Sequence, residues 1–364
     1  MKKKKPNYKL RRKIAKMIVV LLILFPIFLI NRTKILNAPL YISNIKNADI
    51  LDSMFEIGYN KKEAKSTINY LKNNNKIKDD TDNYILKIHN LGYSNKVVDY
   101  VIRNLSTSQI TDFLSKKYNK DFEKYIKNEL FSYKNYDRYL NYKKKHKKLS
   151  IDDIVTRITL NLDKTYYEDS TLIKDPNRID TLANKYLEIP EDYEPNDLVD
   201  MDDKYANNTY GQKQLRKEAY DKFVEMCKAA KKDGVKFYAE SAYRSYKYQN
   251  NIFNSYVYNS GQEAADKYAA KPGFSEHELG LAIDLANIWT ITTKGEEYKW
   301  ISKNAYKYGY IIRYKKEWED ITGYAAESWH IRYVGKKAAS IIQKENIPYE
   351  EYYAKYILTK KSSK

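Results

Sequence analysis

The chain has 364 residues, more than the roughly 100–200 residues of a usual single domain, so we expect two folded parts. Its formal net charge of +19 favours acidic surroundings such as nucleic acid, anionic lipid or some other anionic polymer. We do not expect a nucleic-acid partner, because lysine, asparagine, isoleucine and tyrosine are all abundant and part of the basicity is attributed to this bias in composition rather than to a binding face. The single cysteine, Cys227, excludes an intrachain disulfide.

The amino terminus has the pattern of a membrane anchor. Basic residues at positions 2–5 and 11–16 are followed by an uncharged apolar run at positions 17–30. No convincing cleavage site follows the run, so residues 1–36 are expected to form a cytoplasmic basic flank and an uncleaved signal anchor. The basic end should stay inside the cell, which predicts a single-pass protein of the cell membrane with the remaining chain outside.

Residues 45–148 are polar and helical in rhythm. Stretches 57–68 and 91–102 resemble one another, since each has a Gly-Tyr pair followed by a polar cap residue and a helical pattern, and a weaker third copy begins near residue 117. The region is predicted to be a helical repeat or a plain helical spacer. It could hold the rest of the chain away from the membrane or bind a partner.

The basic run at positions 143–148 marks a boundary, and residues 149–350 alternate helix and strand signals after a proline-punctuated lead-in. This mixture predicts an α+β fold with a small sheet. Residues 351–364 are interpreted as a basic tail. The expected helices are 214–232, 246–258, 299–308 and 336–345, and the expected strands are 235–242, 281–286 and 329–334.

Two of the four histidines lie in dense polar motifs, one running from Phe274 to Asp284 and the other from Glu327 to Tyr333. His277 and Asp284 would stand ~10 Å apart on a continuous helix, too far to bind one metal ion. Gly280 offers a break after which a strand could return Asp284 to the side of His277. In the second motif, strand alternation places His330 and Arg332 on the same face.

Two histidines and one aspartate leave a fourth tetrahedral position for water, which is typical of a catalytic zinc site. We therefore predict that His277, Asp284 and His330 bind zinc. Glu327 is the expected general base, since it lies three residues before His330. Glu276 and Glu278 flank His277 and could have a catalytic role, but they are read equally well as exposed turn residues.

Arg244 stands where an expected strand runs into a helix for which Ser245 is a possible cap. An arginine there could bind a substrate carboxylate or an oxyanion, or it could form an ordinary surface ion pair. The sequence alone leaves both roles open.

These motifs resemble the VanY-type D-alanyl-D-alanine carboxypeptidases of the LAS metallopeptidase group. The resemblance is carried by the Ser-x-His-x-x-Gly-x-Ala-x-Asp motif ending at Asp284, by Glu-x-Trp-His ending at His330, and by the Tyr-Arg-Ser element around Arg244. It extends over roughly residues 186–347. The resemblance implies a small antiparallel sheet flanked by helices. It also implies zinc at the three ligands, catalytic roles for Glu327 and Arg244, and substrate contacts from Ser275 and Gln249.

The implied function is a zinc-dependent D,D-carboxypeptidase that trims peptidoglycan stem peptides outside the cell, where anionic wall polymers are possible further partners. An L,D-carboxypeptidase or a peptidoglycan endopeptidase of the same group would carry nearly the same motifs. A non-enzymatic alternative is a membrane-tethered scaffold that binds the wall through its helical repeats. The intact Glu327 argues against that alternative.

Overall fold

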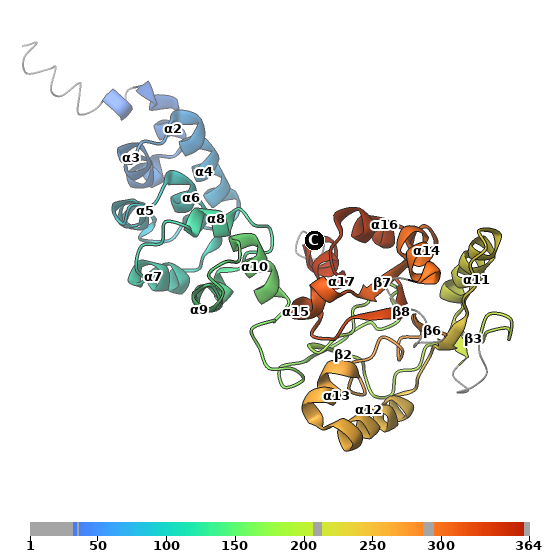
Figure 1. The fold of residues 1–364 in the computed structure, drawn as a ribbon. Coiled ribbons are helices and arrows are strands. Elements are labelled where there is room, and N and C mark those ends of the chain that lie inside the picture. The colour runs from blue at the N-terminus through green and yellow to red at the C-terminus, as the bar shows by residue number, and fades with distance from the viewer. Residues whose placement is uncertain (1–31, 35, 207–212, 287–294, 360–364) are drawn as a thin grey trace, which may run out of the picture. The chain divides into compact units, whose positions relative to one another are not determined.

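The computed structural model describes residues 32–34, 36–206, 213–286 and 295–359. The chain divides into two compact units, Met1–Tyr133 and Lys134–Lys364, so the division falls ahead of the basic run at 143–148 (Figure 1). The predicted anchor at positions 17–30 lies outside the described residues. Within the ranges that are described, no helix has both the length and the apolar character needed to cross a membrane.

The first unit is built from short helices throughout its described part. Both stretches recognised as repeats contain a glycine with positive φ, +90° at Gly58 and +95° at Gly92, followed by a buried tyrosine and then a helix. Asn60 forms a capping box with Glu63 at the start of the first of these helices. In chain order the helices are α2 (Ala38–Ser43), η1 (Ile45–Asn47), α3 (Ala48–Glu56), α4 (Lys61–Asn73), α5 (Thr81–Asn90), α6 (Asn95–Asn104), α7 (Thr107–Ser115) and α8 (Phe122–Ile126).

The second unit mixes helices with short strands. A 3₁₀ turn, η2 (Tyr133–Asn135), leads into it. Its helices are α9 (Tyr136–Lys145), α10 (Ile151–Thr159), α11 (Lys217–Lys232), α12 (Tyr246–Ser260), α13 (Gln262–Tyr268), α14 (Glu296–Asn304), η3 (Ala305–Tyr308), η4 (Lys316–Trp318), α15 (Glu319–Thr322), α16 (Lys336–Glu345), α17 (Tyr349–Tyr352) and the π-helical η5 (Tyr353–Leu358). Its strands are β1 (Thr171–Leu172), β2 (Leu187–Glu188), β3 (Leu198–Asp200), β4 (Gln214–Arg216), β5 (Ala239–Ser241), β6 (Ala282–Leu285), β7 (Tyr310–Tyr314) and β8 (Glu327–Tyr333).

The central sheet has four antiparallel strands in the order β5-β6-β8-β7, and two separate strand pairs, β1-β2 and β3-β4, flank it. Side chains alternate across the sheet. Ile283 and Ile331 pack against the apolar side of α11 in the main core, whereas Asp284 and His330 occupy the opposite face. In Figure 1, α12 and α13 lie below the sheet and α14 and α16 lie above it. The expected α+β fold with a small antiparallel sheet is confirmed.

The expected elements agree with the structure except at some ends. The helix expected at 214–232 begins only at Lys217, because residues Gln214–Arg216 pair with β3 as strand β4. The strand expected at 235–242 is confined to Ala239–Ser241. Strand β7 was not expected, and η5 continues ordered structure to Leu358, within the segment assigned to a tail.

Candidate metal and catalytic site

The three expected metal ligands meet on one face of the central sheet. Asp284 in β6 and His330 in β8 are directly opposite one another in the antiparallel register. His277 reaches them from the turn before β6, which closes with a hydrogen bond of 3.0 Å from Gly280 N to His277 O. Gly280 has a φ of +62°, which confirms it as the break that places Asp284 beside His277.

The ligand atoms of His277, Asp284 and His330 all lie within 4.8 Å of one another, and all three residues are buried. His277 Nδ1 donates a hydrogen bond of 2.7 Å to Ala242 O, which fixes the ring tautomer and leaves Nε2 to face Asp284 Oδ2 at 3.3 Å. His330 Nδ1 lies 3.2 Å from Asp284 Oδ1. Both rings therefore turn one nitrogen towards the aspartate.

This donor set fits zinc. Asp284 Oδ1 is buried and accepts no hydrogen bond from any described residue, as expected of an oxygen placed for a metal ion. Two imidazole nitrogens and a carboxylate oxygen are the donors zinc prefers, and three protein ligands leave one coordination position open. The ion would be held by Nε2 of His277, a carboxylate oxygen of Asp284 and Nδ1 of His330.

The electrostatics of the metal-free site suit a cation. Burial and the neighbouring Arg244 lower the pKa of His277 to about 4, so this ligand is neutral near pH 7. Burial opposes ionisation of Asp284, but His277 and Arg244 outweigh it and hold the pKa of that carboxyl well below its usual value. Burial lowers the pKa of His330, yet its contacts with Asp284 and Glu276 raise it to about 9. A bound metal ion would therefore replace a proton on His330.

Glu327 begins strand β8, at the edge of the cluster. Its Oε2 lies 3.4 Å from His330 Nδ1, and its side chain keeps 17% of its surface exposed, more than any of the three ligands. Burial, with a contribution from Asp284, raises the pKa of Glu327 to about 7. A carboxylate with such a pKa, beside a metal site but outside the cluster of ligands, has the properties of a general base.

Arg244 lies between β5 and α12, and Ser245 caps that helix as expected by accepting a hydrogen bond from Tyr248 N. Arg244 Nη2 pairs with Asp284 Oδ2, and Nε donates a hydrogen bond of 3.0 Å to Ser241 Oγ. The arginine side chain is 15% exposed. The alternative of an ordinary surface ion pair is therefore wrong, because the pair is largely buried and includes a candidate metal ligand.

Ser275 and Gln249 are buried, and their observed contacts shape the loop in front of β6. Ser275 Oγ accepts a hydrogen bond of 3.3 Å from His277 N. Gln249, on α12, donates a hydrogen bond of 2.7 Å from Nε2 to Ala270 O, and its buried Oε1 has no partner among the described residues. Ser275 thus adjoins a ligand directly, whereas Gln249 supports the segment that precedes the motif.

Glu276 and Glu278 are not exposed turn residues, since each is 2% exposed. Glu278 accepts hydrogen bonds from Gly273 N and Ser275 N, and burial raises its pKa to about 8. Burial also opposes ionisation of Glu276, but the guanidinium groups of Arg313 and Arg332 outweigh it and hold the pKa of Glu276 below its usual value. This buried group of charges behind His330 was not predicted from the sequence.

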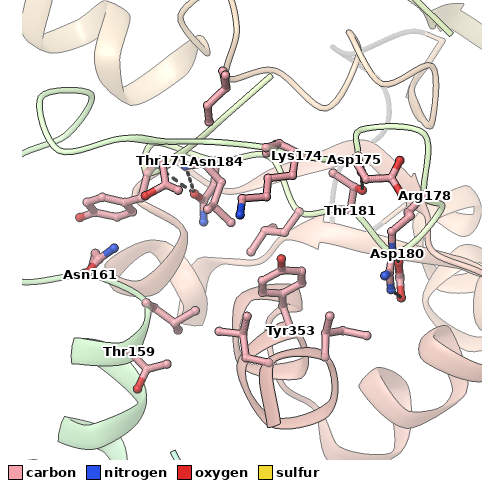
Figure 2. Close-up of a pocket in the computed structure, with 18 residues that line it drawn as sticks. Thr159, Asn161, Thr171, Lys174, Asp175, Arg178, Asp180, Thr181, Asn184 and Tyr353 are labelled. Atoms are coloured by element: carbon pink, nitrogen blue, oxygen red, sulfur yellow. Dashed lines mark hydrogen bonds and ion pairs between the residues drawn. The ribbon is translucent and has the colours of Figure 1, made fainter. Parts of the chain in front are cut away.

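Among the described residues of the second unit, two sizeable cavities lie outside the cluster itself. One of about 330 Å³ is enclosed between the end of α10, the lead-in around Lys174 and the helix η5 (Figure 2). None of its lining residues belongs to the metal cluster. The other, of about 710 Å³, includes Tyr324, whose ring lies 5.3 Å from that of Tyr314. The Tyr314 ring in turn lies 4.9 Å from the His330 ring, but none of the residues that line this second cavity belongs to the metal cluster either.

A small antiparallel sheet with a His-Asp-His cluster and an adjacent carboxylate defines a metallohydrolase. Comparison with known proteins gives the family. The sequence profile of VanY, described as D-alanyl-D-alanine carboxypeptidase, matches residues 212–336. YodJ of Bacillus subtilis (strain 168), named as a carboxypeptidase, is 45% identical over 190 residues, which cover 50% of this chain and 70% of YodJ. The chain belongs to the VanY family of zinc carboxypeptidases, which act on peptidoglycan peptides.

Two further relatives extend the comparison. A D-alanyl-D-alanine carboxypeptidase of Enterococcus faecium is 39% identical over 139 residues, which cover 38% of this chain and 43% of the relative. Among solved structures, the LD-carboxypeptidase LdcB is similar with 41% identity and a TM-score of 0.49, over 52% of this chain and 92% of LdcB.

Proposed function

We propose that this carboxypeptidase is a D,D-enzyme that releases terminal D-alanine from peptidoglycan stem peptides. The observation that carries the proposal is the single buried cluster of His277, Asp284 and His330 with Glu327 at its edge. The family supports the substrate class, since relatives of this chain carry the name D-alanyl-D-alanine carboxypeptidase.

In this proposal the residues of the cluster have separate tasks. Zinc, when bound, lowers the pKa of a water molecule to about 7 and polarises the carbonyl of the peptide. Glu327 takes the proton of the attacking water and delivers it to the leaving amine. Its pKa of about 7 allows it to accept and to donate a proton near neutral pH. The exposed part of Glu327 marks the side from which the peptide approaches.

Arg244 is the proposed contact for the terminal carboxylate or the developing oxyanion. A guanidinium group has five N–H donors, and the contacts with Asp284 and Ser241 involve only its Nη2 and Nε atoms. Its remaining donors can bind a carboxylate in the fork geometry that arginine favours. Ser275 and Gln249 are proposed to shape the substrate site, mainly through the loop that they hold.

Two enzymatic alternatives share this chemistry. An L,D-carboxypeptidase would use the same cluster and the same terminal carboxylate on a peptide of different stereochemistry, and LdcB is an LD-carboxypeptidase. An endopeptidase would not require the terminal carboxylate. A scaffold without activity would not need the water-activating carboxylate Glu327.

The decisive experiment incubates the purified full chain in detergent with synthetic stem peptides and identifies the products by mass spectrometry. A pentapeptide ending in D-Ala-D-Ala should lose one alanine, and the same peptide amidated at its end should react far more slowly. Equal rates on the free and amidated peptides would indicate an endopeptidase. Selective cleavage of a tetrapeptide between an L-centre and its terminal D-Ala would establish the L,D-enzyme instead.

We further propose that the catalytic unit lies outside the cell and that residues 1–36 anchor it in the membrane. The support is the basic flank followed by the apolar run at 17–30. The net charge of +19 would suit contact with anionic wall polymers.

A further inference from the structure

A fully buried network of four charges lies directly behind His330. The side chains of Glu276, Arg313, Arg332 and Glu350 are all 0% exposed. Arg313 Nε donates a hydrogen bond of 2.9 Å to Glu276 Oε1, and its two terminal nitrogens bind both oxygens of Glu350, at 3.0 and 2.6 Å. Arg332 Nη1 lies 3.1 Å from the same Oε1. Two guanidinium groups thus balance two carboxylates in the interior.

The network leaves one oxygen of Glu276 free to face the metal site. Both guanidinium groups contact Oε1, whereas Oε2 is buried and has no hydrogen-bond partner among the described residues. Oε2 lies 3.6 Å from Nε2 of His330, which is buried and also lacks a hydrogen-bond partner there. A shift of a few tenths of an ångström would join the two atoms in a hydrogen bond.

The two ring nitrogens of His330 face different groups, and this decides which of them can bind the metal ion. His330 Nδ1 faces Asp284 and Glu327, so it is the nitrogen that can bind the metal ion. A neutral imidazole whose Nδ1 is a ligand must carry its proton on Nε2. The only carboxylate near Nε2 among the described residues is Glu276. Carboxylates that accept a hydrogen bond from a metal-binding histidine fix the ring and increase its basicity.

We propose that Glu276 is a positioning residue, which accepts a hydrogen bond from His330 Nε2–H and so aims Nδ1 at the zinc ion, while Arg313, Arg332 and Glu350 hold Glu276 in place. This role rests on the proposed metal site. It gives the four buried charges a task that packing alone does not explain, because an apolar group of similar volume would fill the same space without loss of stability.

Glu276→Gln is the informative variant because an amide has only one acceptor oxygen. The two guanidinium groups require that oxygen on their side, so the amide nitrogen must face His330. An N–H group there would donate to Nε2 and move the ring proton to Nδ1, the atom required by the metal. Zinc affinity should therefore fall about 10–100-fold, as for other changes to the partner of a ligating histidine.

Glu278→Gln is the matched control. Glu278 lies two residues away in the same loop and is equally buried, but its oxygens bind Gly273 N and Ser275 N rather than His330. Zinc affinity is measured on the full chain in detergent by competition with a chromophoric chelator. The proposal expects weakened binding in Glu276→Gln and binding close to that of the parent in Glu278→Gln. Unchanged affinity in a folded Glu276→Gln protein would overturn it.

A second measurement needs no variant and so does not depend on folding of a mutant. In the zinc-loaded parent labelled with ¹⁵N-histidine, His330 should show a metal-bound Nδ1 and a protonated Nε2 whose proton exchanges slowly. Only four histidines contribute signals, and His330→Ala assigns the one concerned. Coordination through Nε2 would overturn the proposal. A parent protein that binds no zinc would instead reject the metal site, a result distinct from failure of the Glu276 role.

Discussion

Gly280 is predicted to be sensitive to substitution, and it is the glycine whose turn lies between two of the metal ligands. Its φ of +62° lies in the left-handed region, so alanine there would cost roughly 1–2 kcal/mol in backbone strain. A Cβ atom would also lie 2.9 Å from Arg216 Cγ and 2.9 Å from Leu198 Cδ2. Arg216 cannot move freely, because its guanidinium binds Asp197 and the backbone of Asn177. Overpacking of this kind adds roughly 1–3 kcal/mol.

Gly280→Ala should therefore lower the free energy of unfolding by about 2–5 kcal/mol in total. Denaturant unfolding followed by tryptophan fluorescence measures it selectively, because all four tryptophans lie in the second unit. The control is Gly234→Ala. Gly234 has a φ of +81° and no atom within 4 Å of its would-be Cβ, so it should show the backbone cost alone.

The difference in unfolding free energy between the two variants gives the cost of the close contacts at residue 280. The effect of replacing a glycine on the freedom of the unfolded chain is the same in both variants and cancels. The zinc content of Gly280→Ala should fall as well, because the turn sets the distance from His277 to Asp284. If Gly280→Ala were no less stable than Gly234→Ala, the packing of this turn against Arg216 and Leu198 would not constrain the site.

Three further outcomes are expected. Glu327→Gln should retain zinc, measured by elemental analysis, while turnover of stem peptide falls by about 10²–10⁴-fold; joint loss of zinc would make Glu327 a ligand. The parent should contain about one zinc per chain and His330→Ala much less, and equal contents would reject the ligand set. Protease added to intact wall-stripped cells should remove the catalytic unit, whereas protection without lysis would contradict the proposed anchor.

The metal cluster could be predicted from the sequence because its signals are local. Few histidines occur, two of them sit among carboxylates, and Gly280 explains how residues seven positions apart can meet. Strand alternation then placed His330 and Arg332 on one face, and the structure confirms that His330 faces Asp284 while Arg332 contacts Glu276. Each of these steps depends on neighbours within one short segment.

The charge network could not be predicted in this way. Glu276 is 37 residues from Arg313, which is a further 37 residues from Glu350, and no periodic pattern links positions so far apart. An isolated glutamate in a polar loop favours exposure unless its partners are known. Strand β7, which carries Arg313, also escaped detection because all five of its residues are buried and so lack the alternation of a half-exposed strand.

The position of Glu350 connects the end of the chain with the metal site. Glu350 lies on α17, which packs with η5 and α16 in a small core that also contains Ile311 of β7. Tyr310 and Ile312 alternate with Ile311 and Arg313 along β7 and belong to the main core with α11. One face of this strand therefore lies in the apolar core, and the other carries the buried charge of Arg313. A buried ion pair contributes little net stability compared with apolar residues of the same volume, but loss of one partner leaves an uncompensated charge. Helix α17 therefore contributes to the geometry of the site, because its Glu350 binds Arg313 and Arg313 binds Glu276 beside His330.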